Sequence, residues 1–114
     1  MIPFGAMKAI RFSALGEPDV LRYEDAPDPA TPDDGVVIRV RAVGVNFADT
    51  RFRRGTYFVR PRFPAIPGME AAGEVVAVGA NAGGLAVGDR VMAVGMNTYA
   101  ELMAAKAVTV YPIP

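Results

Sequence analysis

The sequence contains no cysteine and no histidine, and these two absences exclude several kinds of chemistry. Without cysteine there is no disulfide scaffold. The thiolate and imidazole ligands that build most protein zinc sites are also missing, so no metal site is expected. Catalytic triads and Cys–His pairs need an imidazole, which excludes nucleophilic catalysis of that type.

Neither sign of charge is in excess, because 12 Lys and Arg residues offset 12 Asp and Glu residues. A neutral chain has no general attraction to nucleic acid or to an anionic lipid surface. No apolar run approaches the about 20 residues that a membrane helix requires. Residues 1–6 lack the basic head and the apolar core of a signal peptide. We therefore expect a protein of the reducing cytoplasm, with neither nucleic acid nor membrane as partner.

Turn-forming residues are plentiful, since 12 glycines and 10 prolines interrupt a chain of 114 residues, a typical length for one domain. Such interruption favours short strands over long helices. We expect strands over 7–13, 20–25, 36–46, 72–78, 90–94 and 107–111, strand or helix over 99–104, and irregular segments over 26–35 and 57–67. One or two helical turns are expected over 47–54, ended by Gly55. These elements predict a mainly β domain, built as a closed or partly open barrel with one or two short helices.

The segment 36–46 carries the strongest strand pattern. Val36, Ile38, Val40 and Ala42 fall on one face of an ideal strand, opposite a face that holds two arginines. We expect this apolar face to be buried.

Asn46, Asp49 and Tyr57 form the first group of polar residues with chemical potential. Asp49 opens the predicted helix, where a carboxylate caps backbone N–H groups, and this structural role is the simpler account. In the functional account, the Asn46 amide and the Tyr57 phenol donate hydrogen bonds to a ligand carbonyl that gains negative charge. Tyr57 could also donate a proton, although a phenol with a pKa of about 10 is a weak acid at neutral pH.

Glu70 lies in a stretch with three glycines, 67–79, which is followed by the segment Gly88-Asp-Arg-Val91. The glycines permit close backbone approach and tight turns. Between small residues, Glu70 is expected to be partly buried and to need a cationic or donor partner, for which Arg90 is one candidate among several arginines. A structural acid is favoured here over a catalytic one.

An arginine cluster falls among aromatic residues; it comprises Arg51, Arg53, Arg54, Arg60 and Arg62. Basic and aromatic residues together can bind single-stranded nucleic acid, but the neutral chain and the absence of an RNA-binding signature oppose that interpretation. A solvated helix face with packed aromatics is the simpler account. A weaker hypothesis is that some of these arginines line the entrance used by an anionic cofactor.

No nucleotide-binding loop is present. A dinucleotide site needs G-x-G-x-x-G between a strand and a helix. The nearest candidate, residues 79–84, has the wrong spacing, and no helix is expected after it.

Taken in order, residues 44–49, 55–57 and 67–91 resemble the medium-chain dehydrogenase/reductase superfamily, and most closely its zinc-independent quinone oxidoreductases. The pattern G-x-E-x-x-G, followed by V-x-x-V-G and G-D-R-V, is the most specific part. The similarity runs from Met7 to Pro114. It implies that residues 7–114 are a GroES-like catalytic domain, an irregular and partly open β-barrel. Residues 1–6 would be an N-terminal extension or a remnant of cloning.

The resemblance also implies roles for individual residues. Zinc-dependent members of the superfamily carry a cysteine where Asn46 stands and a histidine where Met69 stands, so a metal-free site is implied. Asn46, Asp49 and Tyr57 match active-site positions, and Asn46, Phe47 and Met69 would lie near the nicotinamide. The implied reaction is hydride transfer from NADPH to a quinone, with NADPH bound mainly by a Rossmann domain that is absent from this chain.

Two alternatives stay open. The first is an enone or enoyl-thioester reductase of the same superfamily, in which Tyr57 would protonate carbon after hydride transfer. The second is a non-catalytic GroES-like module for binding or oligomerisation. In either enzymatic case we expect the chain to be a piece of a longer protein and inactive alone. We expect the isolated chain to expose an apolar patch or an unpaired strand edge, which self-association would cover.

Overall fold

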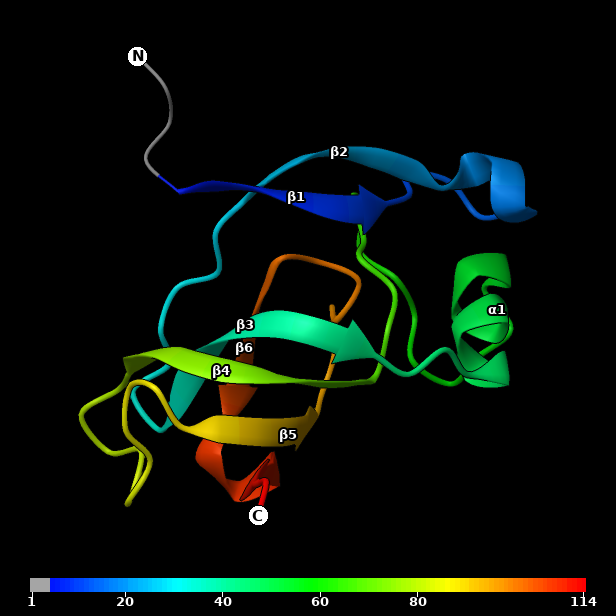
Figure 1. Cartoon of the computed structure of the whole chain (residues 1–114). Coiled ribbons are helices and arrows are strands. Elements are labelled where there is room, and N and C mark those ends of the chain that lie inside the picture. The colour runs from blue at the N-terminus through cyan, green and yellow to red at the C-terminus, as the bar shows by residue number, and fades with distance from the viewer. Residues whose placement is uncertain (1–4) are drawn as a thin grey trace.

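The computed structural model describes residues 5–114, which form two antiparallel sheets and one α-helix (Figure 1). The elements are β1 (Ala6–Arg11), β2 (Arg22–Pro27), β3 (Gly35–Val43), α1 (Phe47–Arg54), β4 (Glu70–Val78), β5 (Arg90–Val94), β6 (Leu102–Lys106) and β7 (Val110–Pro112). Two 3-10 turns, η1 (Pro18–Val20) and η2 (Ala107–Thr109), precede β2 and β7. Residues 1–4, which fall in the expected N-terminal extension, lie outside the described residues.

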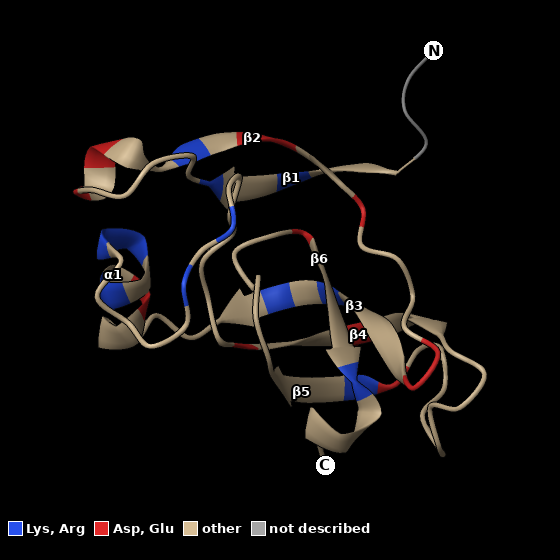
Figure 2. Cartoon of the chain, turned by 180° about the vertical axis from the view of Figure 1, so that it is seen from behind, with Lys and Arg blue, Asp and Glu red and all other residues tan. Residues whose placement is uncertain are grey.

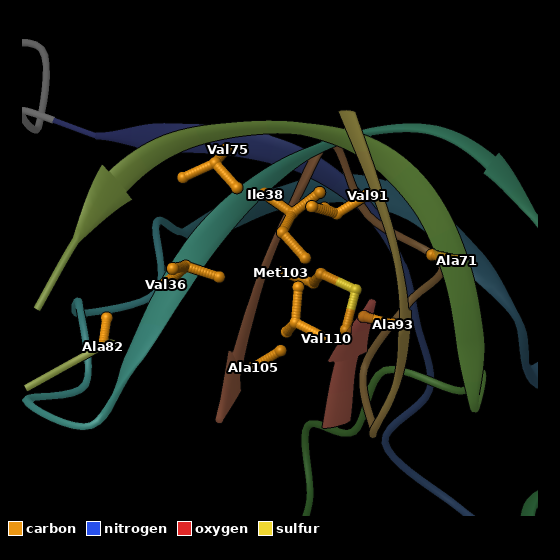
Figure 3. Close-up of a cluster of buried hydrophobic side chains, with 10 residues drawn as sticks. All are labelled: Val36, Ile38, Ala71, Val75, Ala82, Val91, Ala93, Met103, Ala105 and Val110. Atoms are coloured by element: carbon orange, nitrogen blue, oxygen red, sulfur yellow. The ribbon is translucent and has the colours of Figure 1, made fainter. Parts of the chain in front are cut away.

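The larger sheet has the strand order β6-β3-β4-β5-β7 and curls into a half-barrel. Its main core lies inside the curl (Figure 3) and consists of Val36, Ile38, Ala71, Val75, Ala82, Val91, Ala93, Met103, Ala105 and Val110. The smaller sheet pairs β1 with β2. This arrangement confirms the mainly β, barrel-like fold that the sequence predicts.

A separate apolar cluster packs α1 against the end of β1. Phe12, which follows β1, meets Phe52 of α1 edge-on with 5.6 Å between ring centroids. The backbones of Phe12 and Ala65 exchange two hydrogen bonds of 2.9 Å, which ties the irregular segment 57–67 to the same place. The second half of α1 is thereby packed against the chain that follows β1.

The helix 47–54, its stop at Gly55 and the strand 90–94 are confirmed. Gly55 adopts the left-handed conformation (φ 77°), which a glycine enters without a steric penalty. The segment 99–104, left open between strand and helix, contributes to β6.

Five expected segments were wrong in part. The strands expected over 7–13 and 36–46 end earlier, at Arg11 and at Val43. Val20 belongs to η1, because Pro18 starts a 3-10 turn, and β2 therefore begins later, runs to Pro27 and shortens the expected loop 26–35. The segment expected as a strand over 107–111 starts with η2, so only its last part pairs with β5.

Strict alternation along β3 was also wrong. Val37 is buried although it was placed on the wetter face, and Ala42 is exposed although it was placed on the buried one. For Ala42 the cause is the register shift between Val40 and Ala42, which leaves Arg41 as an extra residue in β3 and changes the face on which Ala42 lies. The shift between Val37 and Ile38 adds its extra residue, Val76, to β4 and leaves the alternation of β3 unchanged.

Candidate functional site

The turn from β3 into α1 positions Asn46 and Asp49. Asn46 takes the N-cap position in an extended conformation, and Phe47 begins the helix. Asp49 Oδ2 accepts the backbone N–H of Asn46 at 3.0 Å, and the Asp49 N–H donates to the Asn46 carbonyl at 3.0 Å. A polar N-cap followed by an acid three residues later is a sequence that starts helices, because it satisfies backbone groups that the first turn leaves open.

Asp49 is the centre of this site, and it is buried. The hydroxyl of Tyr99, from the connection between β5 and β6, donates to Asp49 Oδ2 at 2.7 Å. Asp49 Oδ1 is buried and has no hydrogen-bond partner among residues 5–114. Asp49 Oδ2 thus accepts two hydrogen bonds, a local one from the Asn46 N–H and one from Tyr99, which lies 50 residues further along the chain.

Sequence reasoning missed Tyr99 as a site residue. Its only signal was its place in an ambiguous segment, and no local pattern matches a phenol to a carboxylate so distant in sequence. The backbone holds Tyr99 on both sides: its N–H donates to the Pro67 carbonyl at 3.0 Å, and its carbonyl accepts from Ile10 at 2.9 Å. Partial burial, the hydrogen bond to Asp49 and the negative charge of that carboxylate raise the pKa of Tyr99.

Tyr99→Phe tests this contact through the pH dependence of stability. We expect the variant to lose about 1–2 kcal/mol of unfolding free energy at neutral pH, because a hydrogen bond to a carboxylate disappears while the ring stays packed. Since the folded pKa of Tyr99 is raised, its contribution is complete below the unfolded pKa of about 10 and declines as the pH rises further. Urea unfolding at neutral and alkaline pH should therefore show a smaller alkaline loss in Tyr99→Phe than in the parent. Tyr23→Phe, at an exposed tyrosine, is the control, and an identical alkaline slope in parent and Tyr99→Phe would refute the contact.

Tyr57 lies beyond the other end of α1. It is half-buried, packs with the cluster of Phe12 and Phe52, and meets the Phe58 ring with 4.4 Å between centroids. Residues 47–56, which include about 12 Å of helix in α1, separate it from Asn46 along the chain, and no hydrogen bond joins the two within residues 5–114. The structure thus joins Asn46 to Asp49 and leaves Tyr57 apart from both.

Phe47 and Met69 are available to a ligand to different degrees. The Phe47 side chain is 73% exposed, with the Arg51 guanidinium 6.0 Å from its ring centroid. Met69 is half-buried, just before β4, and its carbonyl accepts from the Gly95 N–H at 2.9 Å. An exposed aromatic ring at a helix start is costly to leave in water and is a natural contact for another apolar surface.

The expected partial burial of Glu70 was wrong, because its side chain is exposed. Arg90 is not its partner: Arg90 stands opposite Glu74 in the β4–β5 register, and Glu74 binds Arg41 through two hydrogen bonds of 3.1 and 3.2 Å. As the first residue of β4, Glu70 instead has its side chain against Gly44 at the rim of an apolar pocket of about 440 Å³. Open solvent at the strand end solvates the carboxylate, so it needs no counter-ion.

Apart from Arg51, which lies over the Phe47 ring, the arginine cluster divides into two groups. Arg53 is buried and donates from Nε to the Gly16 carbonyl at 2.9 Å, and Arg54 makes two hydrogen bonds of 3.1 Å to Glu17. These two fasten α1 to the turn before β2. Arg60 and Arg62 instead line a pocket of about 340 Å³.

None of the helices described is long and apolar enough to cross a membrane.

The sequence and the fold of this chain are similar to those of known proteins. The alcohol dehydrogenase GroES-like domain model matches residues 32–114. The quinone oxidoreductase of Lama guanicoe is 41% identical over 111 residues, which cover 95% of this chain and 34% of that protein.

Two solved structures share the fold. The human synaptic vesicle membrane protein VAT-1 homolog-like protein superposes with a TM-score of 0.91 at 36% identity, covering 96% of this chain and 36% of that one. The Escherichia coli quinone oxidoreductase complexed with NADPH gives 0.86 at 31% identity, covering 94% and 33%. The chain therefore spans about a third of the length of the relatives it matches.

Proposed function

This chain belongs to the alcohol dehydrogenase GroES-like domain family of the medium-chain dehydrogenases/reductases, and from that membership we propose that it forms the acceptor-binding part of an NADPH-dependent quinone oxidoreductase. The strongest support is the Asn46–Asp49 turn. A buried carboxylate with two hydrogen bonds fixes the backbone beneath an amide side chain, beside an exposed aromatic ring. A neutral amide donor carried on a fixed backbone suits a carbonyl that gains negative charge.

NADPH would supply the hydride in this reaction. The residues present fit its nicotinamide end, because that ring is planar and apolar and carries a carboxamide. The Phe47 ring and the Met69 side chain would pack against the ring, and the Asn46 amide would hydrogen-bond to the carboxamide or to the acceptor. The remainder of NADPH would be held by a Rossmann domain outside this chain.

The residues of this chain would act by position and by hydrogen bonding. Asn46 donates its amide N–H to the acceptor oxygen as that oxygen becomes negative. Asp49 holds the Asn46 backbone, and Tyr99 holds Asp49. Tyr57 would reach the acceptor from beyond the far end of α1, by a hydrogen bond to a quinone oxygen, and would act as a proton donor only if the acceptor is an enone.

The other parts of the proposal rest on the family resemblance. Residues 7–114 are taken as the GroES-like domain, the site as metal-free and the setting as the cytoplasm. Self-association of the isolated chain, and its lack of activity alone, stay predictions.

A chimeric enzyme tests the proposed function. Residues 7–114 replace the matching third of the E. coli quinone oxidoreductase, and loss of NADPH absorbance is followed with 1,4-benzoquinone as acceptor. We expect quinone-dependent oxidation of NADPH that the isolated chain does not show. NADPH binding, measured separately by fluorescence, serves as the folding control. A chimera that binds NADPH but oxidises it at the same rate with and without quinone would refute the proposal.

Tyr57→Phe in the same chimera separates the quinone and enone reactions. A quinone is reduced on oxygen, and water can protonate the product, so a loss of less than about threefold in kcat is expected. An enone needs protonation at carbon, for which loss of the phenol is expected to lower kcat by about a hundredfold. A parent chimera that prefers 2-cyclohexenone, combined with the large loss, would reassign the chain to the enone reductases.

A further inference from the structure

Two arginines share a pocket that the proposed reaction does not explain. The pocket of about 340 Å³ is bordered by α1, by the irregular segment after it and by the connection between β5 and β6. Arg60, Arg62 and Asn97 supply its polar side chains, and Phe52, Ala65 and Ile66 are among its apolar ones. Both arginines are exposed.

These arginines lack the acidic partners that the neighbouring ones have. Neither Arg60 nor Arg62 takes part in an ion pair or side-chain hydrogen bond within residues 5–114, and no Asp or Glu lines the pocket. Figure 2 shows Lys and Arg on α1 and on the loop segments beside it. Two cations around one hollow repel each other, so an anion placed between them is attracted by both.

The short spacing of the two arginines explains why they meet at the pocket. Only Pro61 stands between them, and side chains two residues apart lie on the same face of an extended segment. A guanidinium offers a planar pair of donors that matches a carboxylate or a phosphate. Asn97 adds an amide group, presented from a left-handed backbone conformation (φ 62°) that asparagine tolerates better than most residues.

The floor of the pocket restricts what carries the anion. Phe52, Ala65 and Ile66 offer apolar surface that a free inorganic ion cannot use. A ligand that satisfies the whole pocket has an anionic group attached to a flat or branched apolar body.

The pocket also borders the candidate site. Phe52 lies on α1 three residues after Asp49, and Asn97 lies two residues before Tyr99, which donates to Asp49. Tyr57 packs against the same cluster that provides Phe52 and Ala65. A ligand anchored here would extend toward the Tyr57 side of the site.

We infer that Arg60, Arg62 and Asn97 form an anion-binding subsite, which holds a carboxylate or phosphate group carried by the apolar acceptor. The binding of an anionic aromatic compound is independent of the reaction, and only its assignment to the acceptor rests on the proposed function. A quinone or thioester with an acidic group would then be preferred over a neutral one.

Binding to the 114-residue chain is measured with 2-naphthoate and its uncharged amide, 2-naphthamide, by NMR titration. We expect 2-naphthoate to bind at least about tenfold more tightly, as two charge-assisted contacts predict, and to shift the backbone signals of residues 60, 62 and 97. Arg62→Gln should lower the affinity for 2-naphthoate about fivefold, and the double change with Arg60→Gln should remove the preference for the anion. The control is Arg22→Gln, which removes the same charge at an exposed arginine on β2. It should leave the preference for 2-naphthoate over 2-naphthamide intact.

Further titrations with pyrophosphate and with NADPH identify the source of the anion. Weak binding of both at these residues supports the acceptor assignment. NADPH that shifts residues 60 and 62 while 2-naphthoate does not would overturn it, and so would equal binding of 2-naphthoate and 2-naphthamide. In the chimera, Arg62→Gln should raise KM for a carboxylated naphthoquinone without changing kcat. A chimera that does not turn over contradicts the proposed function, whereas the naphthoate titration decides the subsite.

Discussion

Gly73→Ala is expected to disrupt the five-stranded sheet, whereas Gly84→Ala leaves it intact. Gly73 lies in β4, opposite Val40 of β3 and Val91 of β5. A Cβ atom at Gly73 would overlap the carbonyl oxygen of Arg39 and lie 3.1 Å from Ile38 Cγ2. The blocking atom belongs to the backbone of a paired strand, so it cannot move without breaking hydrogen bonds of the sheet. We expect a loss of at least about 3 kcal/mol of unfolding free energy, the upper end of ordinary overpacking.

Gly84 provides a matched control for the same chemical change. A Cβ there meets no atom within 4 Å. Alanine at such a site restricts the unfolded chain and should stabilise the protein by about 0.5 kcal/mol. Urea unfolding followed by circular dichroism gives both values. Equal midpoints for the two variants would mean that β3 and β4 are not packed as closely as described.

Asp49→Ala is expected to cost about 2–3 kcal/mol, because it leaves both the Tyr99 hydroxyl and the Asn46 N–H without their acceptor. The effect reaches beyond the helix cap. Loss of the carboxylate releases the contact between the helix start and the β5–β6 connection, which together frame the candidate site.

Asp49→Asn is the informative second variant. Both hydrogen bonds end on Oδ2, so one amide oxygen can accept them both. The amide nitrogen would take the place of Oδ1, which has no partner in the described chain, and would leave buried donors unpaired. We therefore expect a loss of about 1 kcal/mol, smaller than for alanine. Unfolding midpoints for both variants decide the matter, and an alanine variant as stable as the parent would contradict the described site.

The sequence predicted the helix start and stop well because both signals are local. Asn46, Asp49 and Gly55 act within one or two turns, and their roles follow from backbone chemistry alone. The inward and outward faces of β3 were not predictable in the same way. Register shifts depend on how β3 meets β4, which no pattern within β3 contains.

The candidate site shows the same division. Asn46 and Asp49 could be found from their spacing, whereas Tyr99 could not, because tertiary folding alone brings its hydroxyl to Asp49. Likewise, composition showed an arginine cluster but not that Arg54 is neutralised by Glu17 while Arg62 lines an open pocket. Glu70 was misjudged because small neighbours suggest burial, although the strand end leaves it in solvent.

In the proposed reaction, the Asn46 amide, carried on a backbone that Asp49 holds, stabilises the acceptor during hydride transfer. Asn46→Ala in the chimeric enzyme tests this role most directly, with Val45→Ala, at an exposed neighbour, as the control. We expect kcat with 1,4-benzoquinone to fall by about a hundredfold in Asn46→Ala, the usual loss for one oxyanion donor, with NADPH binding changed by less than about threefold. Equal kcat values for Asn46→Ala and Val45→Ala, in chimeras that bind NADPH alike, would contradict it.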